Sequence, residues 1–162
     1  MNTNLTLVIA CGNPLRGDAA IGPTAANIVE SWRIPGVKIL SVHQLVPELI
    51  DEMKRGNRVL FIDAAIDLEG ESFQCHIVEP KTSRRFFGHH ESPANLLSLM
   101  RELEGRTPES WLVSITAVSI EHGEEMTEVA RENLEGALEW IRCYLLGQTA
   151  LGTIRELHDK GG

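Results

Sequence analysis

The amino-acid sequence predicts a single α/β domain in which a mostly parallel sheet is covered by helices on both faces. Strand-like and helix-like segments alternate along the chain, and the first strand is apolar along nearly its whole length. A later pair of strands is joined by a turn too short for a crossover, which indicates one antiparallel strand. We therefore expect a three-layer domain with a twisted sheet of about five strands.

The first half of the chain supplies three of the predicted strands. Residues 5–11 are almost continuously apolar, as expected of a central strand that is buried on both faces. Residues 37–42 and 58–63 are the second and third strands, and helices are predicted between them at residues 23–33 and 47–55. Because parallel crossovers are right-handed, the first strand is expected to lie between the second and the third.

The next strand is predicted at residues 72–78. The tight turn at residues 69–71 joins it to the third strand, and so short a connection indicates an antiparallel hairpin. Residues 80–89 show no periodicity and are expected to form a surface loop.

The C-terminal half contains two predicted helices, the first of which has a clear start signal. Ser92 is the predicted N-cap of the first, Pro93 stands in its first turn, and Gly105 ends it. The last strand is predicted at residues 111–118, and a long amphipathic helix follows at residues 127–146. We assign residues 1–147 to the α/β domain and residues 148–162 to a C-terminal tail or short helix.

The composition argues against nucleic-acid binding and against membrane insertion. The formal net charge is −8 at pH 7, whereas binding to phosphates requires clustered Lys and Arg. No apolar run approaches the roughly 20 residues of a membrane helix, and the N-terminus lacks the pattern of a signal peptide. The three cysteines are widely spaced and form no Cys-x-x-Cys pair, which suits a reducing compartment. We therefore expect a cytoplasmic protein.

The loop of residues 12–18 (GNPLRGD) is the predicted functional site. Its glycine spacing has the outer frame of a phosphate-binding P-loop, but Asp18-Ala19 replaces the Lys-Ser/Thr pair that would neutralise phosphate. The structural alternative is a simple turn between strand and helix with Asp18 as the helix N-cap.

Two carboxylates are predicted to face each other near this loop. Asp18 follows the first strand and Asp63 ends the third, and the chain direction reverses between these strands. In open α/β sheets, ligands bind at such a switch point beyond the carboxyl ends of the strands. A carboxylate at the end of an apolar strand is costly to bury unless it is paired, capped or coordinating. The competing interpretation of Asp63 is a helix or loop cap.

Three other features have a functional and a structural interpretation. His89-His90 precedes a helix start and either supplies a metal ligand or is a loop pair without a role. Residues 121–125 (EHGEE) form either a metal cluster or, as we favour, a solvated acidic loop. Cys11 lies at a strand end without a neighbouring base in the sequence, so we expect a buried, unreactive thiol.

Together these segments resemble the nickel-dependent maturation endopeptidases of NiFe hydrogenases. The resemblance runs from residue 5 to about residue 146 and is carried by the order and spacing of its parts. These parts are the loop of residues 12–18 followed by Ile21-Gly22, the strand that ends in Asp63-Ala64, and His90 ahead of Leu96-Leu97 with Gly105 and Pro108. Residues 43–45 (HQL) and 47–49 (PEL) look like one branch of the family, where other members carry a Gly-Thr segment.

The resemblance implies a function and a set of residues. Members of the family remove a C-terminal extension from the hydrogenase large-subunit precursor after nickel insertion. The nickel is supplied by the substrate and is recognised by two carboxylates and a histidine, a ligand set that suits this metal. By position, Asp63 matches the second carboxylate and His90 the histidine. The first carboxylate follows the family aspartate that matches Asp18, and here that position is Ala19.

Three hypotheses follow. The first is a monomeric nickel-dependent endopeptidase in which Asp18, Asp63 and His90 contact the metal and act in catalysis, with Asp18 replacing the ligand missing at Ala19. The second is a non-catalytic binding or assembly protein on the same fold, motivated by Ala19. The third, which we favour least, is a metal-dependent hydrolase of small molecules.

Overall fold

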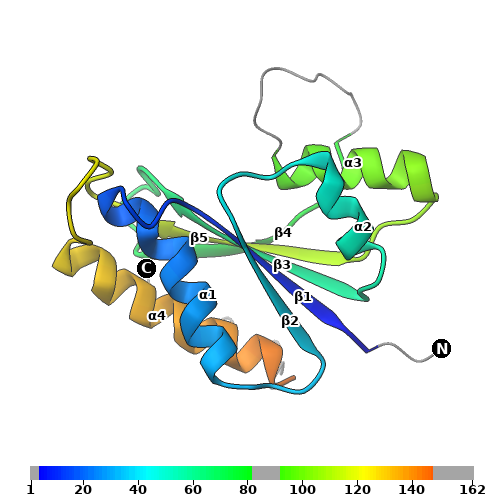
Figure 1. Ribbon diagram of the computed structural model, residues 1–162, viewed down its shortest axis with the longest axis horizontal. Helices are drawn as coiled ribbons and strands as arrows, with labels where there is room; N and C mark the ends of the chain where they lie inside the picture. Colours follow the sequence, from blue (N-terminus) through cyan, green and yellow to red (C-terminus); the bar gives the residue numbers. More distant parts are fainter. Residues whose placement is uncertain (1–3, 82–91, 148–162) are drawn as a thin grey trace.

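A twisted sheet forms the middle layer of the protein (Figure 1). The computed structural model describes residues 4–81 and 92–147, so the predictions for His89, His90 and the C-terminal tail lie outside the described residues. Within the described part of the chain the sheet has five strands in the order β2-β1-β3-β5-β4. They are β1 (Thr6–Cys11), β2 (Val37–Val42), β3 (Arg58–Ala65), β4 (Phe73–Ile77) and β5 (Glu109–Thr116).

Helices cover both faces of this sheet, as predicted. One face carries α1 (Ile21–Ser31) and α4 (Glu128–Leu145), and the other carries α2 (Ile50–Met53) and α3 (Pro93–Glu104) (Figure 1). Short 3-10 turns, η1 (Gly17–Ala20) and η2 (Pro47–Leu49), precede α1 and α2. The predicted α/β class and the central position of β1 between β2 and β3 are confirmed. No helix in the described ranges is long and apolar enough to cross a membrane.

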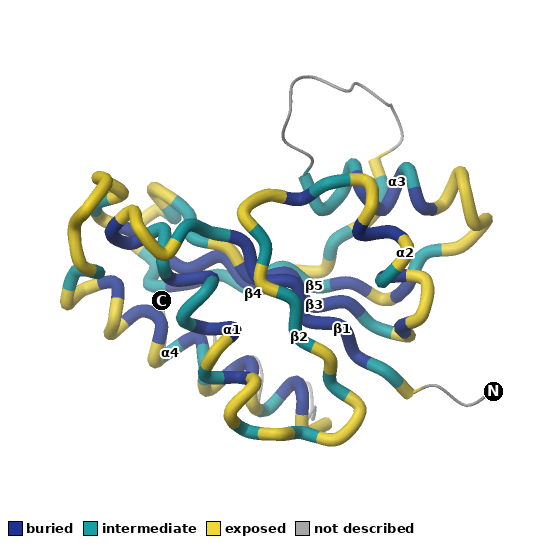
Figure 2. The backbone as a smooth tube through the Cα atoms, in the orientation of Figure 1, coloured by how far each residue is buried: buried dark blue, intermediate teal, exposed yellow. Residues whose placement is uncertain are grey.

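The period-two alternation of the strands divides the core into two parts. In β1, Val8 and Ala10 pack in the cluster that contains α1 and α4, while Leu7, Ile9 and Cys11 pack in the cluster that contains α2 and α3. Strand β1 is buried along its whole length, and β3 is buried from Val59 to Ile62 (Figure 2). The face on which a residue at the end of β1 or β3 lies is therefore set by whether its number is odd or even.

The predicted hairpin between β3 and β4 is wrong. β4 is antiparallel, but it pairs with β5, which lies between β3 and β4 in the sheet. Residues 66–72 are long enough to pass across one strand, because neighbouring strands are only about 4.8 Å apart and an extended residue spans about 3.3 Å. β5 is the better interior strand because most of its residues are buried or half-buried, whereas β4 ends in two exposed residues.

The predicted N-cap of α3 is confirmed, and α4 begins one residue after its predicted start, with Thr127 as its N-cap. The Ser92 hydroxyl accepts a hydrogen bond from the Asn95 N–H at 3.1 Å, and the Thr127 hydroxyl accepts one from the Ala130 N–H at 3.2 Å. Gly105 ends α3 in the left-handed conformation with φ of 74°. The helix predicted at residues 47–55 is shorter than expected, because the chain there forms the 3-10 turn η2 and a single turn of α-helix, α2.

Helix α1 approaches the end of β1 so closely that only glycine fits at position 22. A Cβ atom on Gly22 would overlap the backbone carbonyl of Cys11. This contact presses the N-terminal turn of α1 against the strand end from which the candidate loop departs, so Gly22 fixes where the loop begins and ends.

We expect Gly22→Ala to lower the free energy of unfolding by at least about 1–3 kcal/mol, because backbone must move to admit the methyl group. Urea denaturation measures this change. Gly56→Ala is the matched control, since a Cβ there meets its nearest atoms at an ordinary 3.4 Å. Equal stability of the two variants would contradict the close approach.

Candidate functional site

A crevice of about 380 Å³ opens at the carboxyl ends of the parallel strands β1, β2 and β3. Strand-end residues, the segment after β2 and the start of α3 surround it. Its lining consists of Cys11, Gly12, His43, Gln44, Leu45, Asp63, Ser92 and Pro93. This is the edge of the sheet at which open α/β folds bind their ligands.

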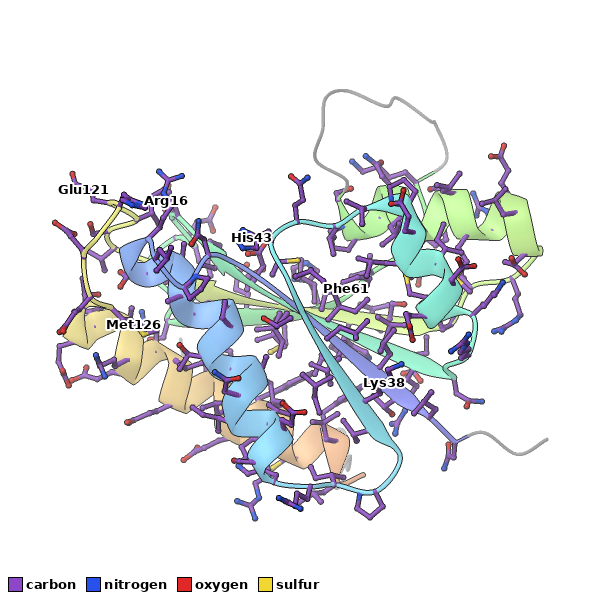
Figure 3. The ribbon with its side chains drawn as sticks, viewed as in Figure 1. Arg16, Lys38, His43, Phe61, Glu121 and Met126 are labelled. Carbon is purple, nitrogen blue, oxygen red and sulfur yellow. The ribbon has the colours of Figure 1, made fainter. Side chains whose placement is uncertain are left out.

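Strand geometry brings Asp63 into this crevice. Val59 and Phe61, two and four residues earlier in β3, pack on the side of α2 and α3, and alternation places Asp63 on the same side. Cys11 reaches that side from β1. The segment after β2 brings His43 over the strand ends (Figure 3), and Ser92 and Pro93 close the crevice from the start of α3.

Asp63 has few partners for its charge. The residue is exposed, and its Oδ1 atom accepts a hydrogen bond from the N–H of Ala64 at 2.8 Å. The surrounding protein nevertheless removes water from the carboxyl group, and this burial raises the pKa of Asp63 to about 6. A carboxylate that is costly to ionise, placed in an open crevice, is suited to bind a cation or to exchange a proton.

Cys11 is an unreactive neighbour of Asp63. The thiol is buried, and burial, followed by the negative charge of Asp63, raises its pKa to about 12. A thiol with that pKa holds its proton at neutral pH and is a poor nucleophile. This agrees with the inert thiol expected from the sequence.

Asp18 lies in a different environment from Asp63. Its side chain is fully buried and contacts the segment between β5 and α4. Oδ2 accepts hydrogen bonds from the N–H groups of Val118 at 2.7 Å and Ser119 at 3.0 Å, and from the Thr127 hydroxyl at 2.9 Å. Oδ1 accepts one from the N–H of Thr127 at 2.7 Å. We call this set of four bonds the Asp18 network.

The Asp18 network stabilises the ionised carboxylate. Burial by itself raises the pKa of Asp18, but the backbone donors of Ser119, Thr127 and Val118 and the Thr127 hydroxyl outweigh burial, so the pKa lies below its ordinary value. The charge is therefore retained at neutral pH and is satisfied entirely by the protein. A metal ion would have to displace these hydrogen bonds to reach the carboxylate.

The two predicted carboxylates do not face each other. Asp63 lines the crevice, whereas Asp18 is absent from its lining and holds the segment ahead of α4. The physical reason is that α1 and α4 lie on one face of the sheet and the crevice on the other. The alternative of Asp18 as a helix cap also fails, because α1 begins after Ala20 and its N-cap position makes no side-chain hydrogen bond.

Ala19 supplies only backbone contacts. It is half-buried, and its carbonyl oxygen accepts a hydrogen bond from the N–H of Asn13 at 2.9 Å, which closes the loop on itself. Its methyl group cannot bind a metal ion.

Of the two histidines that bear on the crevice, the structure describes His43 but not His90. His90 lies outside the described residues, although Ser92, two residues later in the sequence, lines the crevice. His43 is an exposed member of the crevice that we did not assign to the site from the sequence. Its position directly after β2, at the carboxyl edge of the sheet, is the signal that predicts it.

The acidic segment at residues 121–125 is exposed, as expected of a solvated loop. Across residues 4–81 and 92–147, no three His, Cys, Asp or Glu side chains come together in a way that would hold a metal ion.

Comparison with known proteins identifies the fold. Neither a protein-family model nor a curated protein sequence matches the chain. Among solved structures, the NiFe hydrogenase maturation protease HycI from Thermococcus kodakarensis KOD1 is similar, with a TM-score of 0.67 and 24% identity over 89% of this chain and 93% of that chain.

Two further maturation proteases have similar structures. HybD from Thermococcus kodakarensis has a TM-score of 0.68 and 21% identity over 87% of this chain and 99% of that chain. The hydrogenase maturating endopeptidase HybD from E. coli has a TM-score of 0.68 and 23% identity over 90% of this chain and 94% of that chain. The chain therefore has the fold of NiFe hydrogenase maturation proteases, over nearly their whole length.

We expect Asp18→Asn to lower the free energy of unfolding at pH 7 by about 2–4 kcal/mol, because an amide leaves buried N–H donors unmatched. Because the pKa of Asp18 is depressed in the folded protein, its contribution is complete above about pH 4 and is lost as the pH falls through the folded pKa. The difference between wild type and variant should therefore shrink below pH 4 in urea denaturation.

The control for this prediction is Asp51→Asn, which removes a carboxylate whose side chain is 78% exposed. We expect it to change the stability by less than about 0.5 kcal/mol. If Asp18→Asn is as stable as this control at pH 7, the Asp18 network does not hold the fold together.

Proposed function

We propose that this protein is an endopeptidase that removes the C-terminal extension of a NiFe hydrogenase large-subunit precursor after nickel insertion. The observation that carries the proposal is the position of Asp63, a carboxylate with a raised pKa that lines an open crevice at the strand ends. The shared fold with hydrogenase maturation proteases supports the choice of substrate.

In the proposed reaction the nickel belongs to the substrate. Asp63 and His90 are the proposed protein contacts to the metal, since oxygen and nitrogen donors suit nickel. Their contact with the ion positions the scissile bond of the precursor in the crevice, and the ion supplies Lewis acidity. A bound cation also favours the ionised form of Asp63, which counteracts the effect of burial on its pKa.

Asp18 acts differently in this proposal from its sequence-based assignment. Its oxygens already accept four hydrogen bonds, so we propose that it positions the loop of residues 12–18 rather than binding the metal. Ala19 then leaves the first carboxylate position of the family unfilled. His43 adds an exposed imidazole at the crevice, available to the bound precursor.

The proposal extends to the setting of the protein. We propose that it acts in the cytoplasm, as a monomer that meets the precursor transiently and keeps no nickel of its own.

The alternative is a non-catalytic binding or assembly protein on the same fold. Ala19 favours it, because the missing carboxylate removes one expected contact to the metal and Asp18 is not free to replace it. Such a protein would bind the nickel-loaded precursor without cutting it.

Cleavage of a nickel-loaded precursor, followed by mass spectrometry, tests the endopeptidase directly. We expect Asp63→Asn to lower kcat/KM at least about 100-fold, because a metal contact is lost. For wild type, kcat/KM should rise as the pH increases through about 6, where Asp63 becomes ionised. Asp51→Asn is the control and should cleave normally. A wild-type protein that binds the precursor and leaves it intact would support the alternative instead.

Restoring the missing carboxylate separates the two functions further. If the protein is an endopeptidase, Ala19→Glu should lower KM for the nickel-loaded precursor by roughly 10-fold, because it adds a contact to the metal. Ala19→Gln has the same size without the charge and should leave KM unchanged. Cleavage by Ala19→Glu alone, with none by wild type, would show that the natural protein is a binding protein.

A further inference from the structure

Exposed apolar side chains gather at the carboxyl end of the sheet. Of the eight large exposed hydrophobic residues in the described part of the chain, four lie in the loops at this end. We call them the apolar rim: Leu15 (65% exposed), Ile66 (69%), Val118 (63%) and Ile120 (39%). Clustered apolar exposure of this kind is typical of interaction surfaces, whereas scattered single residues are not.

Hydrogen bonds hold the loops of the apolar rim together. The N–H of Gly123 donates to the carbonyl oxygen of Leu15 at 2.9 Å, which joins the loop after β1 to the segment before α4. The N–H of Ala117 donates to the carbonyl oxygen of Ala65 at 2.8 Å, directly before Val118 and Ile66. Figure 3 shows Arg16 and Glu121, from two of these loops, at the same end of the molecule.

The Asp18 network anchors the backbone beneath this surface. Val118 donates its N–H to the buried Asp18 carboxylate at 2.7 Å, so the backbone beneath the rim is anchored while the Val118 side chain faces solvent. A surface that is already ordered binds a partner without a further loss of conformational freedom.

The margin of the apolar rim is acidic. Glu121, Glu124 and Glu125 are exposed in the segment that carries Ile120, and the cations near this segment are Arg16 on the neighbouring loop and Arg131 on α4. A second copy of this chain, with its net charge of −8, would meet repulsion at this margin. A partner with an apolar surface and a basic margin fits it.

The apolar rim is also continuous along the chain with the crevice. Leu15 follows Gly12 by three residues, and Ile66 follows Asp63 by three residues. The rim and the crevice therefore lie at the same end of the sheet, on loops that leave the same strands.

We propose that the apolar rim is the docking surface for the hydrogenase large-subunit precursor, which contacts it through an apolar patch with basic neighbours. This inference rests on the proposed function and adds the surface that selects the substrate. The crevice residues contact the metal and the scissile segment, whereas the rim binds the folded body of the precursor.

The experiment compares Leu15→Ser and Val118→Ser with Leu103→Ser, which lies on α3 and is as exposed as Leu15 at 65%. The probe is the nickel-loaded large-subunit precursor. Its cleavage is measured with each variant, and its Kd is measured with each variant combined with Asp63→Asn to prevent cleavage. We expect the rim variants to raise KM and Kd at least about 5-fold with kcat within about twofold, and Leu103→Ser to change neither.

The salt dependence of precursor binding supplies a second measurement. Raising the salt concentration should weaken binding of the precursor to wild type, and Glu121→Gln combined with Glu125→Gln should reduce that salt dependence. Circular dichroism and urea denaturation confirm that each variant is folded.

The outcomes separate this inference from the proposed function. Cleavage by wild type with unchanged KM in both rim variants would overturn the docking surface and leave the endopeptidase standing. Binding without cleavage, weakened by the rim variants, would support the docking surface and contradict the endopeptidase. Absence of binding to any precursor would overturn both. Light scattering that shows a wild-type dimer and a Leu15→Ser monomer would assign the rim to self-association and overturn the proposal.

Discussion

The buried carboxylate of Asp18 is the interaction on which the rest of this end of the molecule depends. It accepts four hydrogen bonds from residues about 100 positions later in the chain, and it thereby ties the loop after β1 to the segment ahead of α4. A buried charge is tolerated only when it is paired or fully hydrogen-bonded, and here the donors are N–H groups and a hydroxyl. The loops at the carboxyl end of the sheet are consequently fixed relative to one another.

The two carboxylates consequently have different roles, because Asp18 holds the loops in place and Asp63 faces the crevice. Asp18 lies on the side of α1 and α4 and is fully satisfied, while Asp63 lies on the side of α2 and α3 and receives one backbone hydrogen bond. Burial opposes ionisation in both residues, but only in Asp63 is it left uncompensated, so its pKa is raised. A carboxylate whose pKa is raised in this way lowers the free energy of unfolding at neutral pH, where it is ionised. Functional sites commonly carry such a loss of stability.

The proposed function combines this site with the fold. Hydrogenase maturation proteases share the architecture, and the crevice at the strand ends is where such a fold binds its ligand. In this proposal Ala19 supplies no carboxylate to the metal, and Asp18 does not compensate, because its oxygens are already engaged. In the proposal, recognition of the metal rests on Asp63 and His90, and the apolar rim holds the protein that carries the metal.

The sequence by itself determined the α/β class, the position of β1, the capped start of α3 and the placement of Asp63 near the end of a strand, because period, caps and glycine stops are local signals. The tertiary structure decided the strand order and the surroundings of the site residues, because both depend on contacts between distant parts of the chain. It placed β5 between β3 and β4, since burial on two faces favours the more apolar strand for the interior. It turned Asp18 toward Thr127, far along the chain, and brought His43 to the crevice that Asp63 lines, and no local pattern contains these long-range relationships.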